Sequence, residues 1–333
     1  MQLRRFVTLG IAFGLAWSGT GPAVADKAPE SDGLPEIRSR AAAVLDARTG
    51  AEVYVKEADE VRAIASTTKI FVAMAVRKHD IALDGWTQIA RDDARAAIGG
   101  SRTRLDIGQS FRNIDLLRAM LMASDNRAPT ALGRAAGMDG KALVAAMNRV
   151  AKDLGLKKTR FTDTSGLRGN VSTAREMGLA LRAALADPVL AEIMGTTTFE
   201  VKSKSGYAKI RYNTTNVPMI LGTYQVAGGK TGYTHAAGYC FITGASVEGR
   251  DYLFVFLGAD GKNTRFADFN RAAAWLKAGA PGGKVKARAR ARSGDRGGEA
   301  ARVRARGTAT AVTRPLLSRR SRCTWTDHLQ QFG

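Results

Sequence analysis

"YQVAGGKTGYTHAAGYCFITGASVEGRDYLFVFLGAD", residues 224–260, contains three strand-like runs separated by glycine-rich turns. The last two runs are joined through "EGR", a turn typical of a β-hairpin. Near the other end of the chain, "AAAVLDARTGAEVYVKEA" (41–58) alternates around "DARTG", which predicts two more antiparallel strands. "TRFADFNRAAAWLKAG" (264–279) predicts a closing amphipathic helix. Strands at both ends with helices between them predict one antiparallel sheet assembled from distant segments.

Helical patterns fill the middle of the chain. A helix is expected from about Ser66 to Lys78, and residues 113–154 read as a succession of helices with breaks at Gly137 and Gly140. Apolar residues at i, i+3 and i+4 spacing support this reading: Ile114, Leu117, Met120 and Leu121. The expected fold class is α/β in the broad sense, more narrowly α+β, with helices flanking the sheet and a helical region inserted into it.

The N-terminus, "MQLRRFVTLGIAFGLAWSGTGPAVADKA", has the features of a secretory signal. Two arginines precede a twelve-residue apolar run from Phe6 to Trp17, and an AxA site follows at residues 23–25. The run is shorter than the roughly 20 residues that span a bilayer, and no later run approaches that length. We therefore expect residues 1–25 to be a signal peptide and the protein to be exported to the periplasm or cell envelope.

The net charge of +21 is unevenly distributed along the chain. Residues 281–333 hold 13 Lys or Arg against 3 Asp or Glu and show almost no apolar periodicity. We expect a linker at 26–38, a folded domain at 39–280 and a basic, low-complexity, disordered tail at 281–333. The alternative for this tail is electrostatic contact with an anionic envelope polymer or membrane surface. Export, and the lack of helix-turn-helix or aromatic RNA-binding signatures, argue against a nucleic-acid partner.

The cysteines and histidines are few and scattered. Cys240 lies in an apolar run and is expected to be a small buried residue, whereas Cys323 lies in the polar tail, so no disulfide is predicted. The three histidines (His79, His235 and His328) form no metal-ligand spacing. No metal and no cofactor is expected.

"AIASTTKIF" (63–71) places Ser66 and Lys69 one helical turn apart, so that both side chains lie on one face. A serine hydroxyl needs an adjacent base to become a nucleophile, and a lysine made neutral by burial can serve. The alternative is an ordinary helix start, with Ser66 as its N-cap and Lys69 solvated. Two further segments favour the reaction centre: "SDN" at Ser124, Asp125 and Asn126, and "KTG" at Lys230, Thr231 and Gly232. Their order and wide separation are typical of penicillin-recognising serine enzymes.

With these residues in view, the sequence resembles the D-alanyl-D-alanine peptidases, the low-molecular-mass penicillin-binding proteins of serine peptidase family S11. The resemblance spans about residues 36–278. It rests on these segments: "ASTTK", "MLMASDNRAPTALG", "TDTSGL", "VSTAREM", "NTTN", "GGKTGYTHAAGYC" and "GKNTRFAD". "SDNRA" and the last three blocks look most like the type-7 DD-endopeptidases of the bacterial cell wall. The resemblance implies a five-stranded antiparallel sheet of the β-lactamase/DD-peptidase type, without the extra all-β domain of many carboxypeptidases.

The resemblance also implies a task for each motif residue. Ser66 attacks the carbonyl of the penultimate D-alanine, Lys69 takes its proton, and water releases the acyl-enzyme. Ser124 completes the proton relay and Asn126 holds the substrate amide. Lys230 and Thr231 bind the acceptor-side carboxylate. The backbone amides of Ser66 and Tyr233 form the oxyanion hole, with Gly232 giving the substrate room.

Neighbouring residues have ordinary structural explanations. Asp125 is expected to be a cap or an ion-pair partner, and His235 a turn residue beside the cleft. Thr173 and Glu176 in "TARE" fit a capping box. Trp86 and Trp275 are expected in the core.

The implied partners are peptidoglycan stem peptides as substrate and β-lactam antibiotics as covalent inhibitors. The expected activity is that of an endopeptidase cutting D-alanyl-diaminoacyl cross-links, with a D-alanyl-D-alanine carboxypeptidase as the first alternative. A serine β-lactamase ranks lower, because "EMGLA" from Glu176 lacks the asparagine of the family's ExxLN segment. A Ser-His-Asp hydrolase would need a GxSxG elbow, which the sequence lacks. A non-catalytic wall-binding protein is the alternative from another class, and the presence of both Ser66 and Lys69 argues against it.

Overall fold

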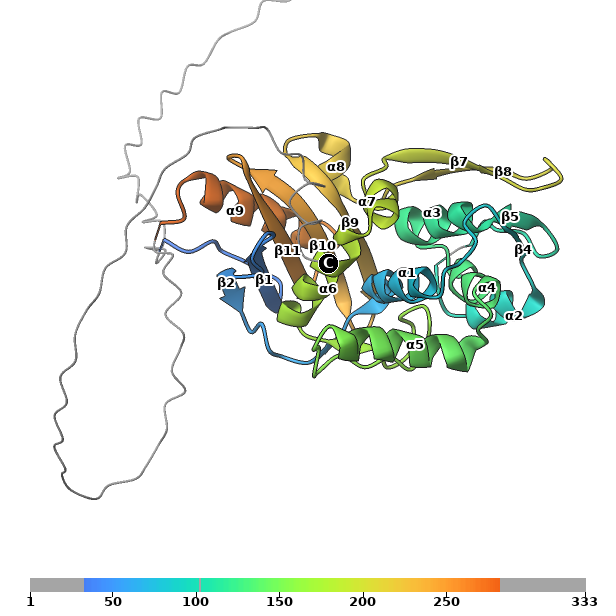
Figure 1. The fold of residues 1–333 in the computed structure, drawn as a ribbon. Helices are drawn as coiled ribbons and strands as arrows, with labels where there is room; N and C mark the ends of the chain where they lie inside the picture. Colours follow the sequence, from blue (N-terminus) through green and yellow to red (C-terminus); the bar gives the residue numbers. More distant parts are fainter. Residues whose placement is uncertain (1–32, 102, 282–333) are drawn as a thin grey trace, which may run out of the picture. The chain divides into compact units, whose positions relative to one another are not determined.

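A computed structural model describes residues 33–101 and 103–281 of the chain, and Figure 1 shows the fold. The main strands are β1 (Ala41–Asp46), β2 (Glu52–Lys56), β9 (Gln225–Thr234), β10 (Gly238–Val247) and β11 (Arg250–Ala259). Short strands are β3 (Arg62–Ala63), β4 (Trp86–Gln88), β5 (Ser110–Arg112), β6 (Val171–Ser172), β7 (Thr198–Lys202) and β8 (Lys209–Asn213). The helical elements up to residue 135 are the 3-10 turn η1 (Ala65–Thr68), α1 (Lys69–Lys78), α2 (Arg91–Ala96), α3 (Asn113–Ala123) and α4 (Ala128–Ala135). The others are α5 (Gly140–Asp153), α6 (Ala174–Ala186), α7 (Pro188–Met194), α8 (Val217–Leu221) and α9 (Thr264–Lys277).

The five long strands form one antiparallel sheet in the order β2-β1-β11-β10-β9. Both predicted hairpins are present, and β1 pairs with β11, which joins segments about 200 residues apart in the sequence. The sheet predicted from the two ends of the chain is therefore confirmed. β9, which carries the "KTG" residues, is the strand at one edge of the sheet.

Side chains that alternate along the strands build two apolar clusters, one on each face of the sheet. Leu253 and Val255 of β11 point to the larger cluster, which is shared with α1 and α6, whereas Phe254 and Phe256 point to a second cluster closed by α9. Figure 1 shows α6 across one face of the sheet. Because both faces are buried, β11 has eight consecutive buried residues rather than the alternation of a half-exposed strand.

The inserted helical region is formed by α2 to α5 together with the antiparallel strand pair β4–β5, and Figure 1 shows it beside α1 and away from β2. The predicted succession of helices between residues 113 and 154 is confirmed as α3, α4 and α5. Gly137 has φ 74°, a left-handed conformation that ends the turn after α4. Gly140 is the first residue of α5 rather than a break.

The predicted helix from Ser66 begins later than expected. Residues 65–68 form a 3-10 turn and the α-helix starts at Lys69. Ala65 has φ 48°, and the Thr67 hydroxyl donates to the Ile64 carbonyl at 2.6 Å, so the entering chain turns sharply instead of continuing a helix. No side-chain cap bond is present at the N-terminus of either element. The alternative interpretation, in which Ser66 is the N-cap of an ordinary helix, is therefore wrong.

Trp275 and Trp86 were both expected in the core, and only Trp275 is buried. Trp275 is buried, and its indole N–H donates to the Gly33 carbonyl at 2.8 Å. Trp86 is 40% exposed, so the prediction of a core position was wrong. It lies on the three-residue strand β4, and the Arg112 guanidinium lies over its ring at 5.5 Å from the ring centre. A two-stranded sheet of this length cannot cover an indole from both sides.

The remaining expectations fall partly outside the described residues. Cys240 is buried and free, as predicted, whereas Cys323, the signal peptide and the basic tail lie outside the described part of the chain. At the end of the predicted linker, Ile37 is buried, and the Ser39 amide and hydroxyl both donate to Asp268 of α9. None of the helices between residues 33 and 281 that the structure describes is long and apolar enough to cross a bilayer.

Candidate active site

Ser66 lies in the 3-10 turn where the sheet meets the helical region. The turn packs against β9 so closely that a Cβ on Gly232 would lie 2.9 Å from the Ser66 nitrogen. Glycine is required at this point because any side chain would push the turn away from the strand. The Ser66 side chain is half-buried, and its hydroxyl lies 3.4 Å from the Ser165 carbonyl.

Lys69 lies one turn further on, and its side chain is fully buried. Its ammonium nitrogen Nζ lies 2.8 Å from Ser66 Oγ, 2.7 Å from Asn126 Oδ1 and 2.9 Å from the Ser165 carbonyl oxygen. Burial lowers the pKa of Lys69 to about 7, against the opposing influence of the Asp163 and Asp125 carboxylates. A substantial fraction of Lys69 is therefore neutral at neutral pH, as a general base must be.

Ser124 comes from the end of α3. It adopts φ 65°, and this left-handed residue ends the helix and turns the following Asp125 and Asn126 back toward the protein. Lys230 of β9 donates to Ser124 Oγ at 2.9 Å and to the Thr231 carbonyl at 2.8 Å. The structure thus links the "SDN" and "KTG" segments directly, as well as linking "SDN" to Lys69 through Asn126.

Lys230 is as buried as Lys69, and its electrostatic surroundings differ. Burial lowers its pKa well below the ordinary lysine value, and the positive charges of Lys69 and Arg265 lower it further. The surroundings of Lys230 therefore disfavour its charged form, which the sequence alone does not indicate. A substrate carboxylate placed beside it would favour the charged form.

The strand residues after Lys230 face a cavity of about 560 Å³ that also contains Ser66, Ser124 and Asn126. Thr231 Oγ1 lies 2.7 Å from Thr215 Oγ1 of the "NTTN" segment, so two hydroxyls meet at the cavity wall. Tyr233 is 46% exposed and stacks on Tyr239 with ring centres 4.2 Å apart. All eight residues predicted from the sequence (Ser66, Lys69, Ser124, Asn126, Lys230, Thr231, Gly232 and Tyr233) come together around this cavity.

Arg265 of α9 also lines this cavity, and the sequence reading did not assign it a role. Its guanidinium donates to the carbonyls of Gly232 and Cys240 at 2.8 and 2.9 Å, which joins α9 to β9 and β10. Burial lowers its pKa only to about 10, so it remains charged at neutral pH. It is a better candidate than Lys230 for a constant positive charge. The segment "GKNTRFAD" was the available signal, but nothing in it marks the arginine as buried.

The segment 162–170 supplies the second missed element, the Ser165 carbonyl. Asp163 accepts hydrogen bonds from four successive amides, those of residues 165 to 168. Asn170 ties the same segment to the Thr68 hydroxyl at 3.2 Å. At Gly166, φ is 83° and a Cβ would collide with the Ala65 carbonyl, so the segment presses against the 3-10 turn. This packing holds the Ser165 carbonyl against Lys69.

Asp125, Thr173 and Glu176 all have structural contacts, but only Thr173 has the contact that was predicted. Asp125 accepts from the amides of Arg104 and Arg127 and from the Tyr212 hydroxyl, so it anchors loops around the site. Thr173 caps α6 by accepting from the Glu176 amide, as predicted. The Glu176 carboxylate instead accepts from the Lys158 amide and the Thr159 hydroxyl, so the capping box is only half formed.

His235 lies at the mouth of the cavity, with its Nδ1 3.5 Å from the Tyr233 hydroxyl. The two rings also meet edge to face, with their centres 5.8 Å apart. His235 lies on the exposed turn between β9 and β10, as expected. Within residues 33–101 and 103–281, no group of three or more His, Cys, Asp or Glu is arranged to hold a metal ion.

Comparisons with known proteins give the family. The sequence model of the D-alanyl-D-alanine carboxypeptidases, peptidase family S11, matches residues 26–261. A D-alanyl-D-alanine endopeptidase of Pseudomonas aeruginosa is 33% identical over 282 residues, covering 84% of this chain and 89% of its own. The D-alanyl-D-alanine endopeptidase of Escherichia coli is 31% identical over 246 residues, covering 74% and 79%.

Among solved structures, the Streptomyces K15 DD-transpeptidase is similar with a TM-score of 0.67 and 25% identity. The match covers 74% of this chain and 99% of that one, and it confirms the expected fold class. On the family match and the two endopeptidase relatives together, the chain belongs to peptidase family S11, the D-alanyl-D-alanine carboxypeptidase family.

Proposed function

We propose that this protein is a serine DD-peptidase that hydrolyses D-alanyl bonds in peptidoglycan stem peptides, with cross-links as its principal substrate. The observation that carries the proposal is the position of the Lys69 amine, 2.8 Å from Ser66 Oγ at the floor of a cavity. The preference for cross-links rests on the two relatives named D-alanyl-D-alanine endopeptidase. The family description supports D-alanyl-D-alanine carboxypeptidase activity as the second candidate.

In the proposed first half-reaction, neutral Lys69 takes the proton of Ser66 Oγ while this oxygen attacks the D-alanyl carbonyl. The resulting oxyanion is expected to be stabilised by the amides of Ser66 and Tyr233. Lys69 then passes this proton through Ser124, which Lys230 contacts at 2.9 Å, to the amine of the leaving group, and Lys69 becomes neutral again. The C–N bond breaks, and the acyl group stays on Ser66 as an ester.

In the second half-reaction, water attacks this ester and gives a proton to neutral Lys69. Lys69 passes the proton to Ser66 Oγ as the ester C–O bond breaks, which releases the acyl product as a carboxylic acid and frees Ser66. Asn126 donates to or accepts from the substrate amide while it holds Lys69 through Oδ1. We assign the leaving-side carboxylate to Thr231, Lys230 and Arg265. Arg265 contributes the constant charge, and a hydroxyl and two cations suit a carboxylate.

β-Lactam antibiotics should acylate the same serine, because a strained lactam carbonyl can occupy the position of the D-alanyl carbonyl. The N-terminal signal reading supports action outside the cytoplasmic membrane, where peptidoglycan is found. Contact of the basic C-terminal segment with an anionic envelope component also stays a prediction.

The decisive test is mass analysis of products from two purified muropeptides, a cross-linked dimer and an uncross-linked pentapeptide. Wild type and Ser66→Ala should be compared at equal concentrations. Cleavage of the dimer that disappears in Ser66→Ala supports the endopeptidase. Release of terminal D-alanine alone would replace it by a carboxypeptidase, and absence of any product from folded wild type would refute the proposal.

A further inference from the structure

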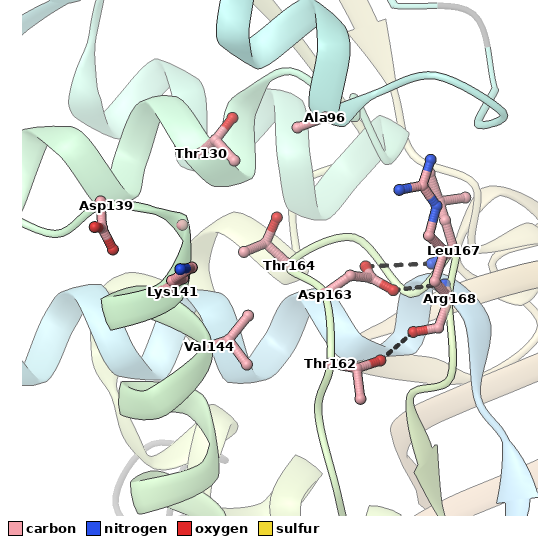
Figure 2. A pocket seen from close by; sticks show the side chains of 11 residues that line it. Ala96, Thr130, Asp139, Lys141, Val144, Thr162, Asp163, Thr164, Leu167 and Arg168 are labelled. Atoms are coloured by element: carbon pink, nitrogen blue, oxygen red, sulfur yellow. Dashed lines mark hydrogen bonds between the residues drawn. The ribbon is translucent and has the colours of Figure 1, made fainter.

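A second cavity, of about 620 Å³, lies next to the candidate active site. Figure 2 shows it between Lys141 and Val144 of α5 and the segment 162–168, with Ala96 and Thr130 on a third side. Apart from Asp163, which acts on Lys69, none of its lining residues has a role in the proposed reaction. The cavity is large enough for several peptide groups, since ligand pockets typically begin at about 300 Å³.

The two cavities share their walls. Leu167 lines both of them. The chain segment 96–101 also borders both, through Ala96 in the second cavity and through Gly99, Gly100 and Ser101 in the first. A chain leaving the active site between these two segments therefore enters the second cavity. The carboxylate assigned to Arg265 belongs to the leaving half of the substrate, so the chain at this exit is the acyl-donor half.

The acidic and basic side chains around the second cavity differ in their hydrogen-bond partners. Asp163 accepts four backbone amides, and Asp139 accepts the Ala142 amide at 2.7 Å as the N-cap of α5. Lys141 and Arg168 are exposed, and their side chains form no hydrogen bond or ion pair with any residue that the structure describes. The acids are thus committed to the backbone, whereas the two cations are free to bind an anion.

We propose that this second cavity is a subsite for the acyl-donor stem peptide, and that Lys141 and Arg168 bind carboxylates of that peptide. This subsite rests on the proposed function. The donor stem would pass Leu167, which lines both cavities, on its way from the active site. Recognition here would favour a complete cross-linked stem over a short acyl donor.

The test uses the charge-reversed double variant Lys141→Glu/Arg168→Glu and a matched control, Arg149→Glu/Lys152→Glu. The control makes the same change in net charge at exposed positions of α5 outside this cavity. For cleavage of the cross-linked dimer, the first variant should lose about tenfold in kcat/KM, mainly through KM, and the control less than twofold. Acylation by benzylpenicillin, which has no stem peptide, should stay within about twofold of wild type in both.

A dimer amidated only at the carboxylates of its donor stem identifies the recognised group, because the leaving-side carboxylate assigned to Arg265 stays intact. Wild type should cleave it about as poorly as the charge-reversed variant cleaves the normal dimer, and the variant should show no further loss. Equal losses in both variants, or equal cleavage of amidated and normal dimer by wild type, would overturn the subsite. Failure of wild type to cleave any dimer in a Ser66-dependent way would instead refute the proposed function, and thermal unfolding of each variant separates either result from misfolding.

Discussion

The buried position of Lys69 leads to a specific pH dependence of acylation. With a pKa of about 7, the neutral fraction of Lys69 is about 1% at pH 5, about 9% at pH 6, one half at pH 7 and about 90% at pH 8. If neutral Lys69 is the base, the second-order rate of acylation should rise about fiftyfold from pH 5 to pH 7. Above pH 8 it should level off.

The assay is stopped-flow acylation by a fluorescent penicillin, because this reagent reports the first half-reaction alone. Lys69→Arg serves as the matched variant, since arginine keeps hydrogen-bond donors near Ser66 but stays protonated at every pH tested. Its acylation rate should fall by about 10²–10⁴ and lose the rise near pH 7. A thermal unfolding curve verifies that the variant is folded.

The direction in which removal of the Asp163 charge shifts the pH profile gives a second test of Lys69 as the base. Asp163 raises the pKa of Lys69, so Asp163→Asn should move the midpoint of the pH profile to lower pH. Asp139→Asn, at the N-cap of α5, should leave the midpoint unchanged. A wild-type rate that is flat between pH 6 and pH 8, or that rises only near pH 10, would refute Lys69 as the base. So would an upward shift in Asp163→Asn.

Three further predictions concern stability and close packing. Between pH 7.5 and 9.5 the unfolded chain binds a proton at Lys69 that the folded chain lacks, so the free energy of unfolding of wild type should rise by about 1.4 kcal/mol per pH unit relative to that of Lys69→Met. Denaturant titrations that give the same pH dependence for both proteins would contradict this. Gly232→Ala should lose acylation and about 1–3 kcal/mol of stability, because its Cβ would meet the Ser66 nitrogen, whereas Gly140→Ala meets nothing within 4 Å and should acylate normally. Glu176→Gln should lower the free energy of unfolding by about 1–2 kcal/mol and leave the rate of release of the penicilloyl group within about twofold of wild type. A hundredfold slower release would instead indicate a β-lactamase-like role for Glu176.

The sequence predicts the sheet well because strand alternation and turn residues are local signals. The hairpin around "DARTG" and the three C-terminal strands depend on patterns within about ten residues. The pairing of β1 with β11 is not local, but few arrangements bury strands from both ends of a chain with helices between them. The exposure of Trp86 was not predicted, because the residue type does not show that its strand belongs to a sheet of only two short strands.

The candidate site was predicted less completely, and the omissions share a cause. Arg265 looks like an ordinary helix residue, and it becomes a site residue only because carbonyls 33 and 25 positions earlier accept its guanidinium. The Ser165 carbonyl is a backbone group, which has no residue identity to recognise. Its position depends on Asp163 and on the contact of Gly166 with the 3-10 turn. Such groups are assigned only by the three-dimensional contacts.

Protonation separates the two lysines of the site in a way that their motifs cannot. Both are fully buried, and burial lowers both pKa values. Lys69 has carboxylates nearby that partly restore its proton affinity, whereas Lys230 has Lys69 and Arg265 nearby, which reduce it. A substrate carboxylate beside Lys230 would reverse this and favour proton binding there. The surroundings of Lys69 thus suit a base, whereas the charge on Lys230 depends on what is bound beside it.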